Sequence, residues 1–190
     1  MELHVRLLTT AERKDVFRRH MKYDFPQDEL RPLRMIQDLV QKGNYYTYGI
    51  YEADVLCAYA YFWEETDAEI LLFDYFAVNR MMRSQGYGTE AMKEILEVCQ
   101  GKNGVILEVE NPDTADTEEE KSIRKRRIAF YERCGLCMSE VRIWLFGVEY
   151  CMMYTGITND DINGKIVEVM QKLYQGVLPG AVYRKMLKVL

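Results

Sequence analysis

The residues best suited to bind a phosphate lie at positions 83–89 (RSQGYGT), between an apolar segment and an amphipathic one. Glycine has no Cβ, so Gly86 and Gly88 allow positive φ and a close approach of the backbone to a ligand. If a helix begins here, the N–H groups of residues 84–89 face outward, unpaired, at the positive end of its dipole. Such a nest binds a pyrophosphate, and Arg83 adds a fixed charge beside it. The spacing predicts an anion site; an ordinary glycine-containing loop is the alternative.

The composition narrows the class of protein. With 190 residues, of which 48% are hydrophobic and 29% charged, the chain fits one globular domain over residues 1–190. The net charge of −5, from 25 Lys and Arg against 30 Asp and Glu, argues against a nucleic-acid partner. No stretch reaches the ~20 apolar residues that cross a bilayer, and the first residues lack the pattern of a signal peptide. We therefore expect a cytoplasmic protein without a membrane partner.

Histidines and cysteines are too few or too scattered to indicate a metal. Only His4 and His20 are present, which excludes a His-rich centre and restricts a Ser-His-Asp triad to two near-terminal residues. The five cysteines are an odd number, and we expect them to be reduced and mostly buried. Cys134 and Cys137 have C-x-x-C spacing, but no second pair completes a zinc site. Because the pair follows a predicted helix instead of opening one, redox chemistry is not favoured either.

Apolar periodicity predicts an alternation of strands and helices around one mixed sheet. Thr9 and Glu12 form a capping-box pattern at the start of the first helix, and Gly43 marks the end of the second. Strands are expected at residues 2–9, 45–51, 55–63, 69–78, 105–109, 136–146 and 149–155. Helices are expected at residues 10–20, 33–42, 89–100, 123–134 and 160–174. The order is that of an α/β domain, with residues 156–190 as a helical C-terminal extension.

The arrangement of a strand, the pattern Arg-x-x-Gly-x-Gly and a helix resembles the GNAT superfamily of acyl-CoA-dependent N-acyltransferases. Residues 128–136 (IAFYERCGL) resemble a second motif of that family, an aromatic-Tyr-Glu helix that ends at Gly before a strand. Together with residues 107–112 (LEVENP), the resemblance covers roughly residues 70–140. It implies the GNAT-like fold, a central mixed, mostly antiparallel sheet of about seven strands flanked by helices.

The resemblance also implies acetyl-CoA as co-substrate, and no metal. In the family the strand before the loop holds the pantetheine arm through its backbone, and the loop holds the pyrophosphate. An N–H near Val78 would polarise the thioester carbonyl. The cofactor-binding residues implied in this way are Phe76, Ala77, Val78, Arg83, Ser84, Gln85, Gly86, Tyr87, Gly88 and Thr89. Tyr87 is expected either to stack near the cofactor or to pack on the sheet.

Two proton transfers are expected in such a reaction. The resemblance implies that Tyr131 donates a proton to the departing thiolate; a core tyrosine that packs beside Phe130 is the alternative. The attacking amine must lose a proton, for which a carboxylate or a water chain is needed. Alternation along the strands lets Asp74 point into the cleft, and it puts Glu108 and Glu110 on one face of the neighbouring strand. Each of these carboxylates could equally be an ion-pair partner.

One position departs from the family pattern. Many members carry an Asn several residues before the aromatic-Tyr pair, whereas Arg124 stands here after the acidic segment 113–120. Five cations follow that segment: Lys121, Arg124, Lys125, Arg126 and Arg127. They could contact the phosphates of the cofactor, but a solvated helix face paired with the preceding Glu run at i,i+4 spacing is favoured.

The acceptor is not fixed by the sequence. Residues 23–29 (YDFPQDE) could accept a cationic amine or simply connect two helices. Residues 144–146 and 151–154 are apolar enough to form a homodimer surface or to close the core. The resemblance implies an N-acetyltransferase that moves an acetyl group from acetyl-CoA to a primary amine, small or on a peptide or protein, by direct attack in a ternary complex. The alternative is a catalytically silent relative that binds acyl-CoA or another protein through the same fold.

Overall fold

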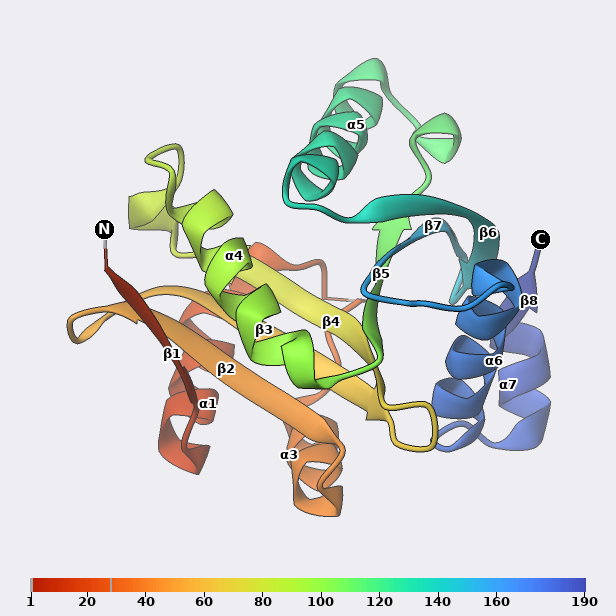
Figure 1. The fold of residues 1–190 in the computed structure, drawn as a ribbon, viewed down its shortest axis with the longest axis horizontal. Helices are drawn as coiled ribbons and strands as arrows, with labels where there is room; N and C mark the ends of the chain where they lie inside the picture. Colours follow the sequence, from red (N-terminus) through yellow and green to blue (C-terminus); the bar gives the residue numbers. More distant parts are fainter. Residues whose placement is uncertain (1, 28) are drawn as a thin grey trace. The chain divides into compact units, whose positions relative to one another are not determined.

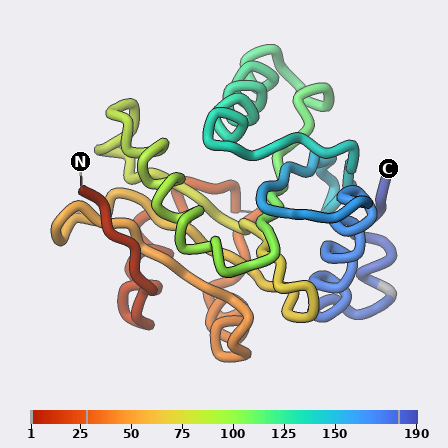
Figure 2. The backbone as a smooth tube through the Cα atoms, viewed as in Figure 1, coloured from red at the N-terminus to blue at the C-terminus, as the bar shows by residue number. Residues whose placement is uncertain are grey.

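The computed structural model describes residues 2–27 and 29–190 (Figure 1). Contacts divide the chain into two compact units. Residues 1–64 and 73–99 form the first unit, and residues 65–72 and 100–190 form the second. In Figure 2 the first unit runs from red to orange and continues in yellow and yellow-green after the interruption at residues 65–72.

The first unit is built on four strands in the order β1-β2-β3-β4. They are β1 (Leu3–Leu7), β2 (Tyr45–Glu52), β3 (Val55–Glu65) and β4 (Ile70–Val78), the last of which belongs to this unit from residue 73 on. Both β1 and β3 pair antiparallel with β2, so that Val5 and Ala58 lie opposite Ile50. The predicted hairpin of β2 and β3 turns at Ala53, whose φ of 50° fits a tight turn. All four strands lie within two residues of their predicted bounds.

Helices pack against these four strands. The predicted capping box is present at α1 (Thr10–Val16), where Thr9 Oγ1 accepts from the Glu12 N–H at 3.3 Å and Glu12 accepts from the Thr9 N–H at 2.8 Å. The chain continues through a π-helix (η1, Phe17–Met21) and α2 (Lys22–Asp24), and α3 (Leu33–Lys42) ends at Gly43 as predicted. Figure 1 shows α4 (Tyr87–Val98) in front of the strands, with α1 and α3 behind them. The core between these layers includes Met21, Ile36, Ile50, Phe62, Met92 and Ile95.

The second unit carries four strands in the order β5-β7-β6-β8. They are β5 (Gly104–Glu110), β6 (Cys137–Leu145), β7 (Val148–Thr155) and β8 (Leu187–Val189), and each neighbouring pair is antiparallel. The helices are α5 (Glu118–Arg133), which contacts β5 and β6, α6 (Ile162–Gln175), which contacts β6 and β8, and α7 (Gly180–Met186). Leu145, Met152 and Met153 are buried, so the apolar strands β6 and β7 close the core of this unit.

Two elements of the second unit differ from the sequence prediction. The chain ends in an eighth strand, β8, where a helical tail and about seven strands were expected, because the free N–H and C=O groups along the edge of β6 accept a short extended partner. Helix α5 begins five residues earlier than predicted. Thr117 caps it by accepting from the Glu120 N–H at 3.1 Å, and three glutamates favour its first turn. Apolar periodicity does not detect a first turn made only of charged residues.

The cysteines carry no sign of metal or redox chemistry. All five are free thiols; two are buried, two half-buried and Cys137 exposed, so fewer are buried than expected. Burial raises the pKa of the Cys134 thiol, the opposite of what a reactive thiol requires. Among residues 2–27 and 29–190, no group of His, Cys, Asp and Glu could hold a metal ion. Nor does any helix in those ranges have the length and hydrophobicity of a membrane-spanning segment.

Candidate functional site

The loop between β4 and α4 has the backbone geometry that the sequence predicts for an anion site. After β4 ends at Val78, a short 3-10 turn (η2, Arg80–Met82) leads to α4, whose N-cap is Gly86. Ser84 and Gly86 have positive φ values of 63° and 89°. A Cβ at Gly86 would meet nothing within 4 Å. Glycine is therefore favoured here by the backbone angle, and the space beside it is open to a ligand.

The first turn of α4 supplies N–H groups toward this space. The helix begins at Tyr87, two residues before its predicted start, so the Tyr87 and Gly88 N–H groups precede any helical acceptor. Thr89 is different, because its N–H donates to the Gly86 carbonyl at 3.2 Å and is not one of the unpaired donors expected. The Tyr87 hydroxyl donates to Glu52 at the end of β2, which anchors this side chain to the sheet.

Two arginines of the loop converge on one buried carboxylate. Arg80 Nε and Arg83 Nη2 lie 3.1 and 2.6 Å from Asp24 Oδ1, and Tyr59 donates to Asp24 Oδ2 at 3.0 Å. The Asp24 side chain is 1% exposed, whereas the side chains of Arg80 and Arg83 are 52% and 48% exposed. One negative and two positive charges leave one net positive charge at the loop. Asp24 belongs to the acidic segment 23–29 that could accept a cationic amine, but its carboxylate is paired with the two arginines of the protein. Asp28 of that segment lies outside the described residues.

Hydrogen bonds hold both the carbonyl and the N–H group of the peptide bond between Val78 and Asn79, at the end of β4. Arg83 Nε donates to the Val78 carbonyl at 3.0 Å, and the Asn79 N–H donates to the Cys57 carbonyl at 2.7 Å. Asn79 therefore has no N–H to offer to a thioester carbonyl. The last three residues of β4, 76–78, are half-buried.

Asp74 lies in a closed ion-pair cluster of the first unit. Arg31 contacts it in a bidentate manner, with Nε 2.9 Å from Oδ2 and Nη2 3.3 Å from Oδ1, and the Tyr45 hydroxyl also donates to Oδ2. The side chains of Arg31 and Asp74 are only 11% and 7% exposed. Burial and the Asp74 charge raise the pKa of Tyr45, which keeps its hydroxyl a donor. No sequence pattern pointed to Arg31, because it lies 43 residues from Asp74 and its partner is set by folding.

Tyr131 is a buried side chain of α5 in the second unit. It is 7% exposed, and its ring meets that of Phe130 edge-on with 5.3 Å between centroids. The helix ends as the motif predicts, with Gly135 at a φ of 91° and the Leu136 N–H donating to the Tyr131 carbonyl at 3.1 Å. Burial raises the pKa of Tyr131 to about 12, so the hydroxyl keeps its proton at neutral pH.

The two carboxylates of β5 have different surroundings. Glu110 is paired with two arginines of α5, with its oxygens 3.0 Å from Arg124 Nη2 and 2.7 Å from Arg127 Nη1. Glu108 is half-buried and accepts from the Tyr174 hydroxyl of α6 at 3.3 Å.

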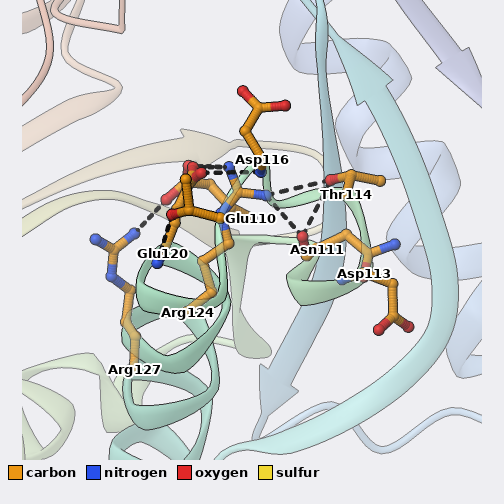
Figure 3. A network of polar contacts seen from close by, with 9 residues as sticks. Glu110, Asn111, Asp113, Thr114, Asp116, Glu120, Arg124 and Arg127 are labelled. Atoms are coloured by element: carbon orange, nitrogen blue, oxygen red, sulfur yellow. Dashed lines mark hydrogen bonds and ion pairs between the residues drawn. The ribbon is translucent and has the colours of Figure 1, made fainter.

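Figure 3 shows how Arg124 joins α5 to the end of β5. Its Nη1 donates to the Asn111 carbonyl at 2.7 Å and to Thr114 at 3.2 Å, and its Nη2 lies 2.5 Å from Glu120, four residues earlier on the helix. The expected i,i+4 pairing with the Glu run is present, but Arg124 is buried instead of solvated, with 8% exposure. A hollow of about 450 Å³ lies against the other side of α5, where three of the five cations contribute to the lining: Glu118, Lys121, Ser122, Lys125, Arg126 and Ala129.

A model of the acetyltransferase (GNAT) family matches residues 10–136. The match covers more than half of the chain and includes both the loop at 83–89 and Tyr131. The chain belongs to the GNAT family. It is therefore an acyltransferase that uses acetyl-CoA as acetyl donor. No curated protein sequence matches the chain.

Solved GNAT structures have the same fold. A protein from Bacteroides thetaiotaomicron assigned to the GNAT family is 22% identical, with a TM-score of 0.70 over 90% of this chain and 96% of that one. The ribosomal-protein-S18-alanine N-acetyltransferase of Escherichia coli is 15% identical, with a TM-score of 0.60 over 85% of this chain and 99% of that one. Spermidine N-acetyltransferase of Vibrio cholerae, in complex with CoA and spermine, is 11% identical, with a TM-score of 0.60 over 80% and 94%. These similarities establish the GNAT fold and its α/β class.

The loop of the first unit fits the cofactor of a GNAT enzyme. A pyrophosphate needs N–H donors, open space and positive charge. The N–H groups in the first turn of α4, the free space beside Gly86 and the two arginines supply all three.

Proposed function

We propose that this protein transfers an acetyl group from acetyl-CoA to a primary amine that attacks the thioester directly. The observation that carries the proposal is the β4–α4 loop, with its left-handed Gly86, its open space and its net positive charge. Acetyl-CoA supplies an activated acetyl group. Transfer forms a C–N bond, breaks the C–S bond, removes a proton from the amine and returns one to the thiolate.

Residues of the loop and of β4 hold the cofactor in this proposal. The backbone of Phe76, Ala77 and Val78 pairs with the pantetheine arm like an added strand, which their place at the end of β4 supports. The pyrophosphate is held by Arg83 and by the backbone of the residues that follow it: Ser84, Gln85, Gly86, Tyr87 and Gly88. Thr89 is included because it lies in the first turn of α4, beside this site, while its own N–H donates to the Gly86 carbonyl.

Tyr131 donates the proton to the departing thiolate in this proposal. Its raised pKa keeps the phenol protonated over the whole neutral range, as a proton donor requires. Its burial also excludes water, which would otherwise compete as the donor.

We propose Asp74 as the group that accepts the proton of the amine, with Glu108 as the alternative. Asp74 lies two residues before Phe76 on β4, which supports the assignment, while its contacts with Arg31 and Tyr45 also fit an ion pair that only holds the strand. The variants Asp74→Asn and Glu108→Gln separate these roles. Loss of a base lowers kcat at neutral pH, and this decrease becomes smaller as the pH rises toward the pKa of the amine, about 10, because the amine then loses its proton without help. Loss of a structural ion pair lowers kcat equally at every pH.

The acceptor is a primary amine on a small molecule or on a protein. Relatives of the same fold are named for both kinds, spermidine in one case and the alanine of ribosomal protein S18 in the other. We further propose that the two units belong to one domain, supported by a family match that includes parts of both, and that the protein is cytoplasmic, supported by its five free thiols.

Calorimetric titration with acetyl-CoA tests the proposed function. We expect micromolar binding that Gly88→Trp abolishes, because the indole fills the space in front of the N–H groups. Gly101→Trp is the matched control, since it places the same side chain at an exposed glycine outside the loop, where a Cβ meets nothing within 4 Å. Release of free thiol with a panel of amines then identifies the acceptor. Absence of binding by the unchanged protein would contradict the proposal.

The variant Tyr131→Phe tests the proton donor. We expect kcat to fall about a hundredfold while acetyl-CoA still binds, because only the hydroxyl is removed. The rate of the unchanged enzyme should rise with pH as the amine loses its proton, with no fall caused by Tyr131 below its pKa of about 12. Full activity of the variant, or a fall in the wild-type rate near pH 8 that the variant abolishes, would contradict the assignment.

A further inference from the structure

Asp24 occupies an unusual place for a carboxylate. It ends the short helix α2, and its side chain is 1% exposed. Both of its oxygens are in use: Oδ1 accepts from Arg80 Nε and Arg83 Nη2, and Oδ2 accepts from the Tyr59 hydroxyl. A buried carboxylate is stable only when it is paired and hydrogen-bonded in this way.

The two arginines are held at their inner ends by more than this carboxylate. Arg83 also donates to the Val78 carbonyl at 3.0 Å. Arg80 donates to the Tyr23 carbonyl and lies over the Tyr23 ring, 5.5 Å from its centroid. Each guanidinium group is thus fixed on the protein side, while about half of each side chain is still exposed.

Such fixation matters for binding an anion. A free arginine side chain loses rotamer entropy when it is immobilised on a ligand, and a side chain that is already immobilised avoids that loss. The anchor also acts on the backbone, because Arg80 and Arg83 flank the turn that leads to the positive φ of Ser84 and Gly86. Asp24 and Tyr59 therefore bear on the shape of a loop that lies far from them in the sequence.

We propose that Asp24 is a positioning residue that, with Tyr59 behind it, orders the β4–α4 loop for the pyrophosphate of acetyl-CoA. The inference rests on the proposed function of that loop and goes beyond it by naming what holds the loop in its binding shape. Burial and the Asp24 charge raise the pKa of Tyr59, so its hydroxyl stays a donor to Asp24. Both guanidinium groups lie within 3.1 Å of one oxygen of Asp24 despite their like charge.

A ligand pair separates positioning from a general structural role. Acetyl-CoA carries the pyrophosphate, and acetyl-pantetheine has the same thioester arm without it. Asp24→Asn keeps the shape of the side chain but removes the charge that holds the two guanidinium groups. It makes the loop more positive, so weaker binding of an anion by this variant reports lost positioning and not lost charge. We expect calorimetric titration to show about tenfold weaker binding of acetyl-CoA by this variant, and less than a twofold change for acetyl-pantetheine.

The second variant is Tyr59→Phe, which leaves Asp24 in place and removes only the bond to Oδ2. We expect about threefold weaker binding of acetyl-CoA, again with acetyl-pantetheine unchanged. If Asp24→Asn fails to fold, Tyr59→Phe still tests the role of Asp24, because it changes only the hydrogen bond to that carboxylate. Matched controls are Asp15→Asn, which breaks an exposed ion pair with Arg19, and Tyr46→Phe, which removes a tyrosine–carboxylate bond to Glu64. Neither control should change the ratio of the two affinities.

Three outcomes would overturn the inference. Equal weakening of both ligands by Asp24→Asn and Tyr59→Phe would show a structural role only. Unchanged affinity for acetyl-CoA in folded variants would show that the loop keeps its shape without the anchor. Absence of acetyl-CoA binding by the unchanged protein would overturn the proposed function together with this inference, and so differs from the first two results.

Discussion

Each unit of the molecule contains a cluster of arginines and carboxylates, and the two clusters differ in charge and exposure. In the first unit the Asp24 carboxylate faces the two guanidinium groups of Arg80 and Arg83, so these three groups carry one net positive charge, on half-exposed side chains. In the second unit two glutamates face two arginines, so the cluster is neutral; its members are Glu110, Glu120, Arg124 and Arg127. Arg124 at its centre is 9% exposed at the side chain.

The difference shows how the same residue types serve two purposes. A neutral cluster has no charge left for a ligand, and here it joins the start of α5 to the end of β5 through the buried Arg124 (Figure 3). A cluster with one cation in excess and with exposed guanidinium groups can attract an anion. The sign of the local charge, more than the number of arginines, thus separates a binding cluster from a structural one.

The largest effect is expected when the neutral cluster is broken. Arg124→Met leaves Glu110 and Glu120 without their shared buried cation, and we expect the free energy of unfolding to fall by about 3 kcal/mol. Chemical denaturation measures this change. The control is Arg126→Met on the exposed face of the same helix, which should stay within about 0.5 kcal/mol of the unchanged protein. Equal stability of the two variants would show that the second cluster is not structural.

A smaller effect, on binding alone, is expected in the first cluster. Arg83→Gln removes the excess positive charge while Arg80 still pairs with Asp24, and we expect about tenfold weaker binding of acetyl-CoA with little change in Tm. Arg19→Gln is the control, since it breaks an exposed pair with Asp15. If Arg83→Gln lowered Tm strongly and left the affinity unchanged, the contrast between the clusters would be reversed.

The smallest effect is expected at the exposed pair of Arg6 and Glu12. The hydrogen bond from Arg6, with those from Thr9, lowers the pKa of Glu12 to about 2. A lowered pKa means that the stabilisation is present above the ordinary value of about 4.5 and is lost as the pH falls toward 2. Glu12→Gln should therefore cost well under 1 kcal/mol at pH 7, and the difference from the unchanged protein should vanish in acid. A difference that persists at pH 2 would contradict this account.

Features with local causes were predicted from the sequence. The capping box of Thr9 and Glu12, the end of α3 at Gly43 and the positive φ at Gly86 each depend on residues a few positions apart. The strands of the first unit were predicted within two residues for the same reason. The eighth strand was missed because its three residues are extended only through pairing with the edge of β6.

The partners of the carboxylates were not predicted. The sequence offered Asp74 as the proton acceptor with Glu108 and Glu110 as competitors, and the different surroundings of the three appear only with Arg31, Tyr174 and the arginines of α5 in place. The same holds for Asp24: its segment, residues 23–29, was expected to accept a cationic amine or to connect two helices, and the pairing of its carboxylate with Arg80 and Arg83 was not predicted.

The sequence by itself determined the order of the elements, the glycine spacing of the cofactor loop and the motif around Tyr131, because backbone angles and helix ends are set by neighbouring residues. Only the tertiary structure decided which charges are neutralised and which remain. Asp24 and Arg83 are 59 residues apart, and Arg31 and Asp74 are 43 apart. Electrostatic interactions act over a few ångströms of space, so the chemistry of these side chains is fixed only when folding brings distant segments together.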